Sequence, residues 1–361
     1  MNTEITKAVY IYPGWHKEPF RKNNKGEILN EWELVLNAKP YFEGHRQPRR
    51  PLHIYDDSLV QTSEWHISLA KKYKIDAFIY CFYWSFGKRF LYKPLDEAFL
   101  GCKANTEIKF AIMWANRMPR GILPVKNIKG PVIHPSRYVY TNEEDFLNLI
   151  KFAAGHYFSR PNYLKIDGRY IFLIFDSAFF LRDTTPEKAK EIIYNSRRWL
   201  LRNGYEDLYL IALNPAPQFM RAYKYAGFNA ISHYVWLPDW KGEYLQNYEE
   251  LIVKRASEWD YFSEQSELNY YPAVSNGWDA TPRGIFRKDK IPKRYPYWPI
   301  VINESPEKFA DFVKMAIEYN RENNKEKILF VTSMNEYSEG HYIEPDADFG
   351  EGFLEVIRDA V

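Results

Sequence analysis

The chain has 361 residues, of which 18% are aromatic, and its 49 Lys and Arg against 47 Asp and Glu give a formal net charge of +2. This balance provides no broad basic surface for nucleic acid or an anionic membrane, and we expect neither partner. The length suits one (β/α)8 barrel with long loops and is sufficient to bury a large core.

Eight short runs rich in β-branched and aromatic residues predict strands that are buried on both faces, as in a parallel sheet. In chain order they are residues 8–12, 77–83, 110–114, 170–175, 208–213, 230–235, 270–275 and 328–332. Amphipathic stretches between them predict helices. These are residues 59–73, 143–156, 186–202, 219–225, 248–262 and 306–320. Asn142, Thr185 and Ser305 stand where an N-cap is expected, before proline or acidic residues.

This alternation of strands and helices predicts an α/β fold, a single (β/α)8 TIM barrel formed by residues 1–361 as one domain. No linker or internal repeat divides the chain, and we expect a monomer. Two long loops, residues 13–57 and 276–302, follow strands, and in a barrel such loops form the mouth of the active site. They are therefore candidate walls of a substrate site.

Targeting signals are not evident in the sequence. The first residues, MNTEITKAVYIYPGW, lack the apolar core of a signal peptide, and no window is long and apolar enough for a membrane span. We expect a soluble chain, and its compartment stays open between the cytoplasm and secretion with a signal peptide that has been removed.

Aromatic side chains are the unusual feature of the composition. Their flat apolar faces and polar edges suit the stacking of sugar rings, so the 29 Tyr, 24 Phe and 11 Trp favour a carbohydrate site. A large core filled by aromatic rings is the simpler interpretation, and the composition alone does not separate the two.

Polar and aromatic residues follow the end of every predicted strand, which is where a barrel carries its chemistry. The candidate substrate-binding residues at these ends are Trp15, His16, Tyr83, Trp84, Trp114, Asn116, Asp176, Tyr234, Trp236, Asn276, Trp278, Asp279 and Tyr337. A single polar residue after a strand is usually only a loop cap. The recurrence of an aromatic residue beside an amide or acid at these ends is the stronger indication.

Glu336 and Glu339 follow the last predicted strand and are the candidate catalytic residues. Their spacing in a turn can place both carboxylates on one side, and cleavage of a glycosidic bond requires two such groups. Pairs of surface glutamates on helices are also common without any function.

Other chemistries lack their usual motifs. The sequence contains no GxSxG elbow, Walker loop, HExxH or strand-to-helix GxGxxG, its histidines are scattered, and Cys81 and Cys102 belong to no CxxC or Cys/His spacing. We therefore expect no metal and no cofactor, and we interpret both cysteines as buried thiols.

Six ordered motifs give the chain a family resemblance. They are EWELVLNAKPYFEGHRQPRRP at 31–51, GKRFLYKPLD at 87–96, MWAN at 113–116, NYLKIDGRYIFLIF at 162–175, NGWDATPRG at 276–284 and MNEYSEGHYIEPDADFG at 334–350. With these motifs the chain resembles the WbsX-type, glycoside hydrolase family 99-like proteins from its first strand to its end. The resemblance implies a (β/α)8 barrel, in agreement with the strand count.

The resemblance also implies a mechanism. Family 99 endo-α-mannosidases use the two glutamates of an ExxE motif after the last strand, which by motif position are Glu336 and Glu339 here. Glu336 would remove the proton of a sugar 2-hydroxyl so that O2 displaces the leaving group, and Glu339 would protonate the departing oxygen and later activate water. The implied substrate is an oligo- or polysaccharide with a 1,2-trans-diaxial bond, as in α-mannosides and α-L-rhamnosides.

The chain departs from the pattern of its relatives at several positions. Relatives commonly have Trp near the first glutamate, where this chain has Met334 and Tyr337, and an acid after WAN, where it has Arg117. Arg117 can pair with an acid or bind an anionic sugar. The other basic residues in the motifs that raise the possibility of an acidic or sulfated glycan are Lys88, Arg89, Arg120 and Arg283.

Three functions follow from these observations. The first is a retaining glycoside hydrolase, endo-acting on a polysaccharide or glycoconjugate. The alternatives are a glycosyltransferase of surface-polysaccharide biosynthesis, as WbsX-type members are often described, and a non-catalytic glycan-binding barrel. Against the transferase, the sequence shows no DxD-like diphosphate motif at a strand end, and the barrel is not the usual doubly wound frame.

Overall fold

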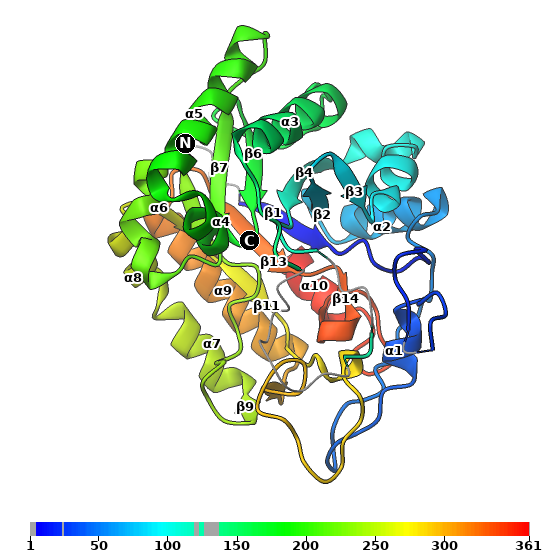
Figure 1. The fold of residues 1–361 in the computed structure, drawn as a ribbon. Coiled ribbons are helices and arrows are strands. Elements are labelled where there is room, and N and C mark those ends of the chain that lie inside the picture. Colours follow the sequence, from blue (N-terminus) through cyan, green and yellow to red (C-terminus); the bar gives the residue numbers. More distant parts are fainter. Residues whose placement is uncertain (1–4, 24, 119–122, 126–136, 361) are drawn as a thin grey trace.

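The fold is taken from a computed structural model that describes residues 5–23, 25–118, 123–125 and 137–360. A ring of mostly parallel strands stands at its centre with helices outside (Figure 1). The strands of the ring are β1 (Thr6–Ile11), β2 (Ala77–Ser85), β4 (Lys109–Trp114), β6 (Arg169–Ile174), β7 (Leu208–Leu213), β8 (Ala230–Ser232), β10 (Asn269–Tyr271), β11 (Ala273–Ser275) and β13 (Ile328–Thr332).

The ring closes through a strand that is divided in two. The order of pairing is β10-β8-β7-β6-β4-β2-β1-β13-β11, so the two ends of the path, β10 and β11, are separated along the chain by Pro272 alone. Proline has no N–H to donate to a ladder, which explains the break. The Pro272 carbonyl still accepts from the Phe330 N–H at 3.1 Å in β13. Taken together, β10 and β11 make the eighth member of the ring, which confirms the predicted barrel.

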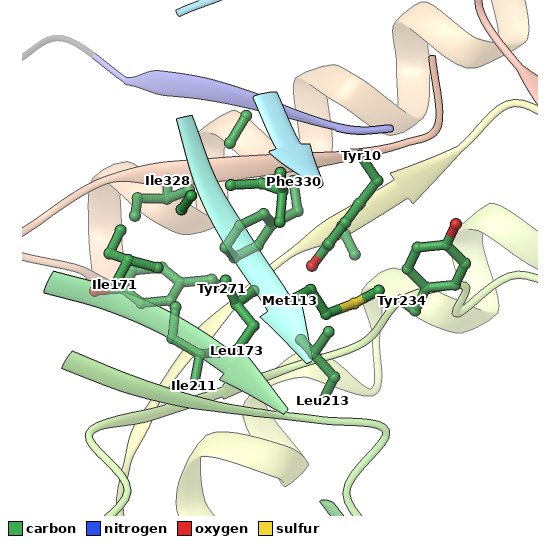
Figure 2. Close-up of a cluster of buried hydrophobic side chains, with 14 of the residues drawn as sticks. Tyr10, Met113, Ile171, Leu173, Ile211, Leu213, Tyr234, Tyr271, Ile328 and Phe330 are labelled. Atoms are coloured by element: carbon green, nitrogen blue, oxygen red, sulfur yellow. The ribbon is translucent and has the colours of Figure 1, made fainter. Parts of the chain in front are cut away.

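Side chains fill the inside of the ring. Figure 2 shows large apolar residues from successive strands meeting there, among them Met113, Leu173, Ile211 and Phe330, all buried. This is the layered packing of a barrel interior, and it leaves the strand ends as the place for a site.

The helices outside the ring agree closely with the sequence prediction. They are α2 (Val60–Lys72), α3 (Glu143–Ala153) followed by a π-helical turn (Ala154–Phe158), α5 (Pro186–Arg202), α6 (Met220–Ala226), α7 (Tyr248–Ala256), α8 (Trp259–Ser266) and α9 (Pro306–Asn323). The side chains of Asn142, Thr185 and Ser305 each accept a backbone N–H in the first turn, which confirms the three predicted caps.

Most boundaries differ from the prediction by one to three residues, and two elements differ in a further respect. The helix expected over 248–262 is two helices, because the chain turns at Ser257. After this turn Trp259 stacks on Phe312 of α9, with ring centroids 5.8 Å apart. The strand expected over 230–235 ends at Ser232, since the Tyr234 N–H turns to the side chain of Asn214 at 3.1 Å. Three short helices, α1 (Trp32–Leu36), α4 (Ser177–Thr184) and α10 (Gly352–Asp359), were not predicted.

Short elements beyond the ring hold the loops together. They are β3 (Lys88–Phe90), β5 (Lys165–Ile166), β9 (Leu245–Asn247), β12 (Ile300–Ile302), β14 (Asn335–Glu336) and β15 (His341–Tyr342), with π-helical Pro94–Phe99 and 3₁₀ turns at Lys103–Glu107, Pro217–Phe219, Thr281–Arg283 and Tyr337–Glu339. The two long loops lie against each other at the carboxyl ends of the strands, where His45 contacts Asp279 at 2.9 Å. Among the described residues, no helix combines the length and apolar character that crossing a bilayer requires.

Candidate active site

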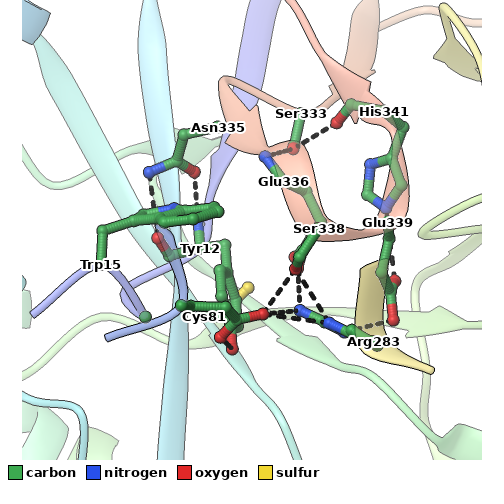
Figure 3. Close-up of polar contacts among 12 residues, drawn as sticks. Tyr12, Trp15, Cys81, Arg283, Ser333, Asn335, Glu336, Ser338, Glu339 and His341 are labelled. Carbon is green, nitrogen blue, oxygen red and sulfur yellow. Dashed lines mark hydrogen bonds and ion pairs between the residues drawn. The ribbon is translucent and has the colours of Figure 1, made fainter. Parts of the chain in front are cut away.

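Glu336 and Glu339 lie in the hairpin that follows β13, formed by β14, the turn Tyr337–Glu339 and β15 (Figure 3). The side chain of Asn335 ties this hairpin to the end of β1, accepting from the Tyr12 N–H at 2.8 Å and donating to the Tyr12 carbonyl at 3.0 Å. Gly340 has a left-handed φ of +71°, and a Cβ there would meet the Asp279 backbone nitrogen at 2.7 Å. The local chain therefore fixes where both carboxylates stand.

The two carboxylates are close together and largely shielded from solvent. Glu336 is 3% exposed, and the Glu339 side chain is 14% exposed. Three atoms lie within 4.8 Å of one another, namely one carboxylate oxygen of Glu336, one of Glu339 and a ring nitrogen of His341. The two carboxylates are therefore close enough to act on one bond.

Arg283 stands between the two carboxylates. Its Nη2 donates to Glu336 Oε1 at 2.5 Å, and its Nη1 donates to Glu339 Oε1. The same guanidinium also binds a third carboxylate, Glu31, through Nη2 at 2.7 Å and Nε at 3.0 Å. We call Glu31, Arg283, Glu336 and Glu339 the carboxylate cluster.

Glu31 is completely buried and belongs to the loop after β1. Its second oxygen accepts from Arg21 and from the Tyr12 hydroxyl at 2.9 Å. Burial alone would raise the pKa of Glu31, but the charges of Arg283 and Arg21 and the Ser338 hydrogen bond outweigh it and lower the pKa to about 2. Glu31 is therefore ionised at neutral pH.

The two candidate catalytic carboxyls differ in proton affinity. Burial, together with the charges of Glu339 and Glu31, raises the pKa of Glu336 well above its ordinary value against the opposing charge of Arg283. Burial also acts on Glu339, but Arg283, His341 and Tyr295 outweigh it and hold its pKa well below the ordinary value. These shifts favour the protonated form of Glu336 over that of Glu339, and the two groups titrate together as a pair.

Aromatic residues and a histidine border Glu339. The Tyr295 hydroxyl donates to Glu339 Oε1 at 2.7 Å, and His341 Nε2 lies 3.4 Å from Oε2. Trp278 stacks on His341 with ring centroids 5.6 Å apart. Burial lowers the pKa of His341, so its ring is neutral.

Glu336, Glu339 and His341 have the residue types of a metal site. Arg283 already provides a positive charge that contacts both carboxylates, so a cation would compete with it for the same oxygens. The expectation that no metal binds remains a prediction.

Three predicted residues lie together after β4 and β6, and we call the two that form an ion pair, Arg117 and Asp176, the Arg117 pair. Arg117 binds Asp176 through Nε at 2.6 Å and Nη2 at 2.5 Å. Asn116 joins the two strand ends, since its side chain bonds both the N–H and the carbonyl of Asp176, at 2.7 and 3.0 Å. Of the two roles left open for Arg117, the structure shows the pairing with an acid.

Tyr83, Tyr234 and Trp236 were also predicted at strand ends. The Tyr234 hydroxyl donates to Glu336 Oε2 at 3.1 Å. Burial and the charges of Cys81 and Glu336 raise the pKa of Tyr83, which is therefore near the same carboxylate. Trp236 instead stacks on His233 at 4.2 Å. The first two line the site beside Glu336.

Four predicted aromatic residues serve packing. Trp15 and Tyr337 are buried in one cluster with Trp32, and their rings lie 5.8 Å apart. Trp114 is 1% exposed and donates to the Trp84 carbonyl at 3.1 Å, while the Trp84 indole donates to Asp145 at 2.8 Å. Sequence reasoning proposed these rings as sugar contacts, but the structure uses them to support the strand ends because their faces meet other side chains.

His16, Asn276 and Asp279 are likewise buried, and each contacts protein partners. His16 lies between Asp57 at 2.6 Å and Glu18 at 2.9 Å, and these contacts raise its pKa even though burial opposes them. Asn276 donates to the Tyr342 carbonyl at 2.5 Å, and Asp279 is fully buried against His45, Gln47 and Thr281. Lys88 is exposed on β3.

The residues that contact Glu336 and Glu339 from the two long loops were not predicted from the sequence. Glu31 and Tyr295 belong to the two long loops, and no local pattern marks them as partners of Glu336 or Glu339. Arg283 was noted only as a basic residue of a motif. The relevant signal was the position of Glu31 and Arg283 inside motifs at 31–51 and 276–284, which became informative once the loops were seen to meet.

The comparisons with known proteins agree with this architecture. The sequence pattern of the family described as Glycosyltransferase WbsX matches residues 7–357. The chain belongs to the WbsX family. It is 25% identical to uncharacterized protein WxcX of Xanthomonas campestris pv. campestris strain B100, and to the same protein of strain ATCC 33913, over 99% of its own length. The chain spans about half the length of these curated relatives, 49% in each case.

Solved structures with the same fold include an endo-α-mannosidase of glycoside hydrolase family 99 from Bacteroides thetaiotaomicron, in complex with bis-tris-propane. It is 16% identical, covers 98% of this chain and 95% of its own, and superposes with a TM-score of 0.62. A glycoside hydrolase-like protein is 15% identical over 99% of this chain and 94% of its own, also with a TM-score of 0.62. At this identity the likeness shows the fold, and the resemblance to WbsX and family 99 proteins expected from the motifs is confirmed.

Proposed function

We propose that the chain is a retaining glycoside hydrolase that cuts within an oligo- or polysaccharide at a 1,2-trans-diaxial bond. The observation that carries the proposal is the pair of shielded carboxylates, with oxygens within 4.8 Å of each other, at the carboxyl ends of the barrel strands. The family 99 enzyme with the same fold is described as an endo-α-mannosidase, which supports an α-manno- or α-L-rhamno-configured substrate.

Glu336 and Glu339 divide the chemistry between them. Glu336 takes the proton of the sugar 2-hydroxyl while O2 attacks the anomeric carbon, and Glu339 gives its proton to the departing glycosidic oxygen. The product is a 1,2-anhydro sugar. Water then opens that ring at the anomeric carbon, with Glu339 accepting the water proton and Glu336 returning a proton to O2. Two inversions at the anomeric carbon leave its configuration retained.

The proton must change place before the first step. The pKa shifts of the free protein favour a proton on Glu336, whereas the leaving oxygen requires a proton on Glu339. Both carboxylates contact the same guanidinium, so a sugar whose 2-hydroxyl donates to Glu336 stabilises the ionised form of Glu336 and leaves the proton to Glu339. Binding of the sugar is therefore proposed to set the reactive protonation state.

The sugar at the carboxylates is proposed to be neutral. Arg283 is engaged by three carboxylates, Arg117 pairs with Asp176, and Arg89 pairs with Asp96. The basic residues that the sequence offered to an anionic sugar are thus largely occupied. Arg120 lies outside the described residues, and Lys88 is exposed on β3.

The test is reducing-sugar release from α-mannans, rhamnose-containing polysaccharides and acidic glycans by the wild type, Glu336→Gln and Glu339→Gln. We expect release from a neutral manno- or rhamno-configured glycan, lowered by about 10²- to 10⁴-fold in each variant. Glu344→Gln is the matched control, because Glu344 is buried in the same region but pairs with His66 at 2.8 Å. Cleavage of α-glucosides alone would contradict the stereochemical part of the proposal.

A glycosyltransferase is the second candidate, and the description of the family favours it. Such an enzyme needs an activated sugar donor, so a nucleotide sugar should raise the melting temperature of the protein. Hydrolysis without any nucleotide supports the first proposal. A third outcome, glycan binding that persists without Glu336 and Glu339 and without turnover, identifies a binding barrel.

A further inference from the structure

We propose that Arg283 is a positioning residue that holds Glu336 and Glu339 as a pair sharing one proton, and that Glu31 and Arg21 keep Arg283 in place. The inference rests on the proposed function in one respect, that Glu336 and Glu339 are the reacting groups. It adds a residue whose part is to fix the geometry and protonation of that pair.

Each nitrogen of the Arg283 guanidinium group donates to a different set of partners. Nη1 faces Glu339 and the Tyr295 hydroxyl, Nη2 faces Glu336 and Glu31, and Nε faces Glu31 and the Ser338 hydroxyl. A guanidinium presents its N–H groups in a rigid planar fork, so it fixes the separation of the carboxylates that it binds. A lysine ammonium is a point charge without that fork.

Arg283 is itself anchored from behind. Glu31 and Arg21 are 0% and 1% exposed and form an ion pair, and Arg21 Nη1 donates to the Gly14 carbonyl at 2.7 Å. The main chain of Arg283 is also tied, because its carbonyl accepts from the Val125 N–H at 2.7 Å. The guanidinium therefore has little freedom to leave the carboxylates.

The charges of the carboxylate cluster do not balance when every group is ionised. Among the described residues, two guanidinium groups contact three carboxylates in this cluster, and His341 is neutral. Full ionisation of these groups would leave one uncompensated negative charge in a buried site. Such a charge is costly, and one bound proton removes it. The other described titratable groups near the cluster are Tyr12, Tyr83, Tyr234, Tyr295 and Cys81, with Arg137 acting on Tyr83 and Arg49 on His341.

The test is a titration that requires no substrate. Glutamate side chains are labelled with ¹³C, the Glu336 and Glu339 signals are assigned with the Glu336→Gln and Glu339→Gln variants, and their midpoints are followed against pH. In Arg283→Lys we expect the carboxyl midpoints to rise by about one pH unit, a tenfold increase in proton affinity. In Glu31→Gln, Arg283 binds one carboxylate fewer and the negative charge of Glu31 is removed. We therefore expect the titration midpoint of Glu336 to fall by a similar amount.

Arg197→Lys is the matched control, since Arg197 is a partly buried arginine on α5 that pairs with Asp207 at 2.9 Å outside the ring. Its substitution should leave both midpoints unchanged. The acid limb of kcat/KM against pH should move with the midpoints in Arg283→Lys. A merely structural role would lower activity at every pH without moving that limb.

Opposite shifts in Arg283→Lys and Glu31→Gln support the proposal. Unchanged midpoints in folded Arg283→Lys, or shifts of the same sign in both variants, overturn it. If Arg283→Lys does not fold, Glu31→Gln decides, because a midpoint of Glu336 that stays or rises overturns the proposal. If these shifts occur but Glu336→Gln still releases sugar at the wild-type rate, the proposed hydrolysis fails while the role of Arg283 stands.

Discussion

The carboxylate cluster and the Arg117 pair lie at the same end of the barrel and use the same residue types in different ratios. Arg117 meets one carboxylate, Asp176, and their charges cancel. Arg283 meets three, and Arg21 compensates only part of the excess. The presence of an arginine at a strand end therefore does not by itself indicate function. The informative feature is whether the carboxylates around that arginine outnumber the positive charges.

The largest expected difference between the two groups is in stability. Arg283→Met leaves three carboxylates around an apolar side chain, and removal of one partner from a buried ionic group costs about 3–5 kcal/mol. Arg117→Met should cost about 1 kcal/mol, because the Arg117 side chain is 28% exposed and the Asp176 carboxylate keeps the Phe179 N–H as a partner. Urea unfolding of both variants measures this, and equal losses would remove the distinction.

A pH effect of nearly the same size should belong to the carboxylate cluster. The pKa of Glu31 falls from an ordinary value of 4.5 to about 2 on folding. A lowered pKa stabilises the fold above pH 4.5, and that stabilisation disappears as the pH falls from 4.5 toward 2. The shift corresponds to about 3 kcal/mol. About 2 kcal/mol of it is lost by pH 3, because the pH has then passed only part of the range between the two pKa values. The unfolding free energy of the wild type should therefore lose about 2 kcal/mol more between pH 6 and pH 3 than that of Glu31→Gln, and parallel curves would contradict the prediction.

Asn116 tests whether the Arg117 pair is a structural link. Asn116→Ala removes both hydrogen bonds to the Asp176 backbone and leaves buried groups without partners, which costs about 1–3 kcal/mol. Asn203→Ala is the control, because Asn203 is exposed and caps only its own helix end. A stability loss within about 0.5 kcal/mol for Asn116→Ala would show that the link contributes little.

The smallest expected effect is at Tyr295. Tyr295→Phe removes one hydrogen bond to Glu339 and keeps the ring, so kcat/KM for the glycan should fall about tenfold, the effect of roughly 1.4 kcal/mol. Tyr140→Phe is the control, since Tyr140 is 55% exposed. Equal activity of the two variants would mean that the hydroxyl of Tyr295 does not influence Glu339.

Local sequence patterns determined most of the barrel. The runs 208–213 and 328–332 and the helix 186–202 match β7, β13 and α5 residue for residue, because continuous apolar runs and capped amphipathic stretches need only neighbouring residues to be recognised. The pair Glu336 and Glu339 was found in the same way, from its place after the last strand.

The tertiary structure alone decided which residues surround that pair. Glu31 and Arg283 lie in loops far apart in the sequence, and only closure of the ring brings them together at 2.7 Å. It also decided that Trp15 and Asp279 are buried among protein partners although they follow strands like the other candidates. The physical reason is that periodicity and caps are properties of adjacent residues, whereas charge balance and burial depend on which loops meet in space.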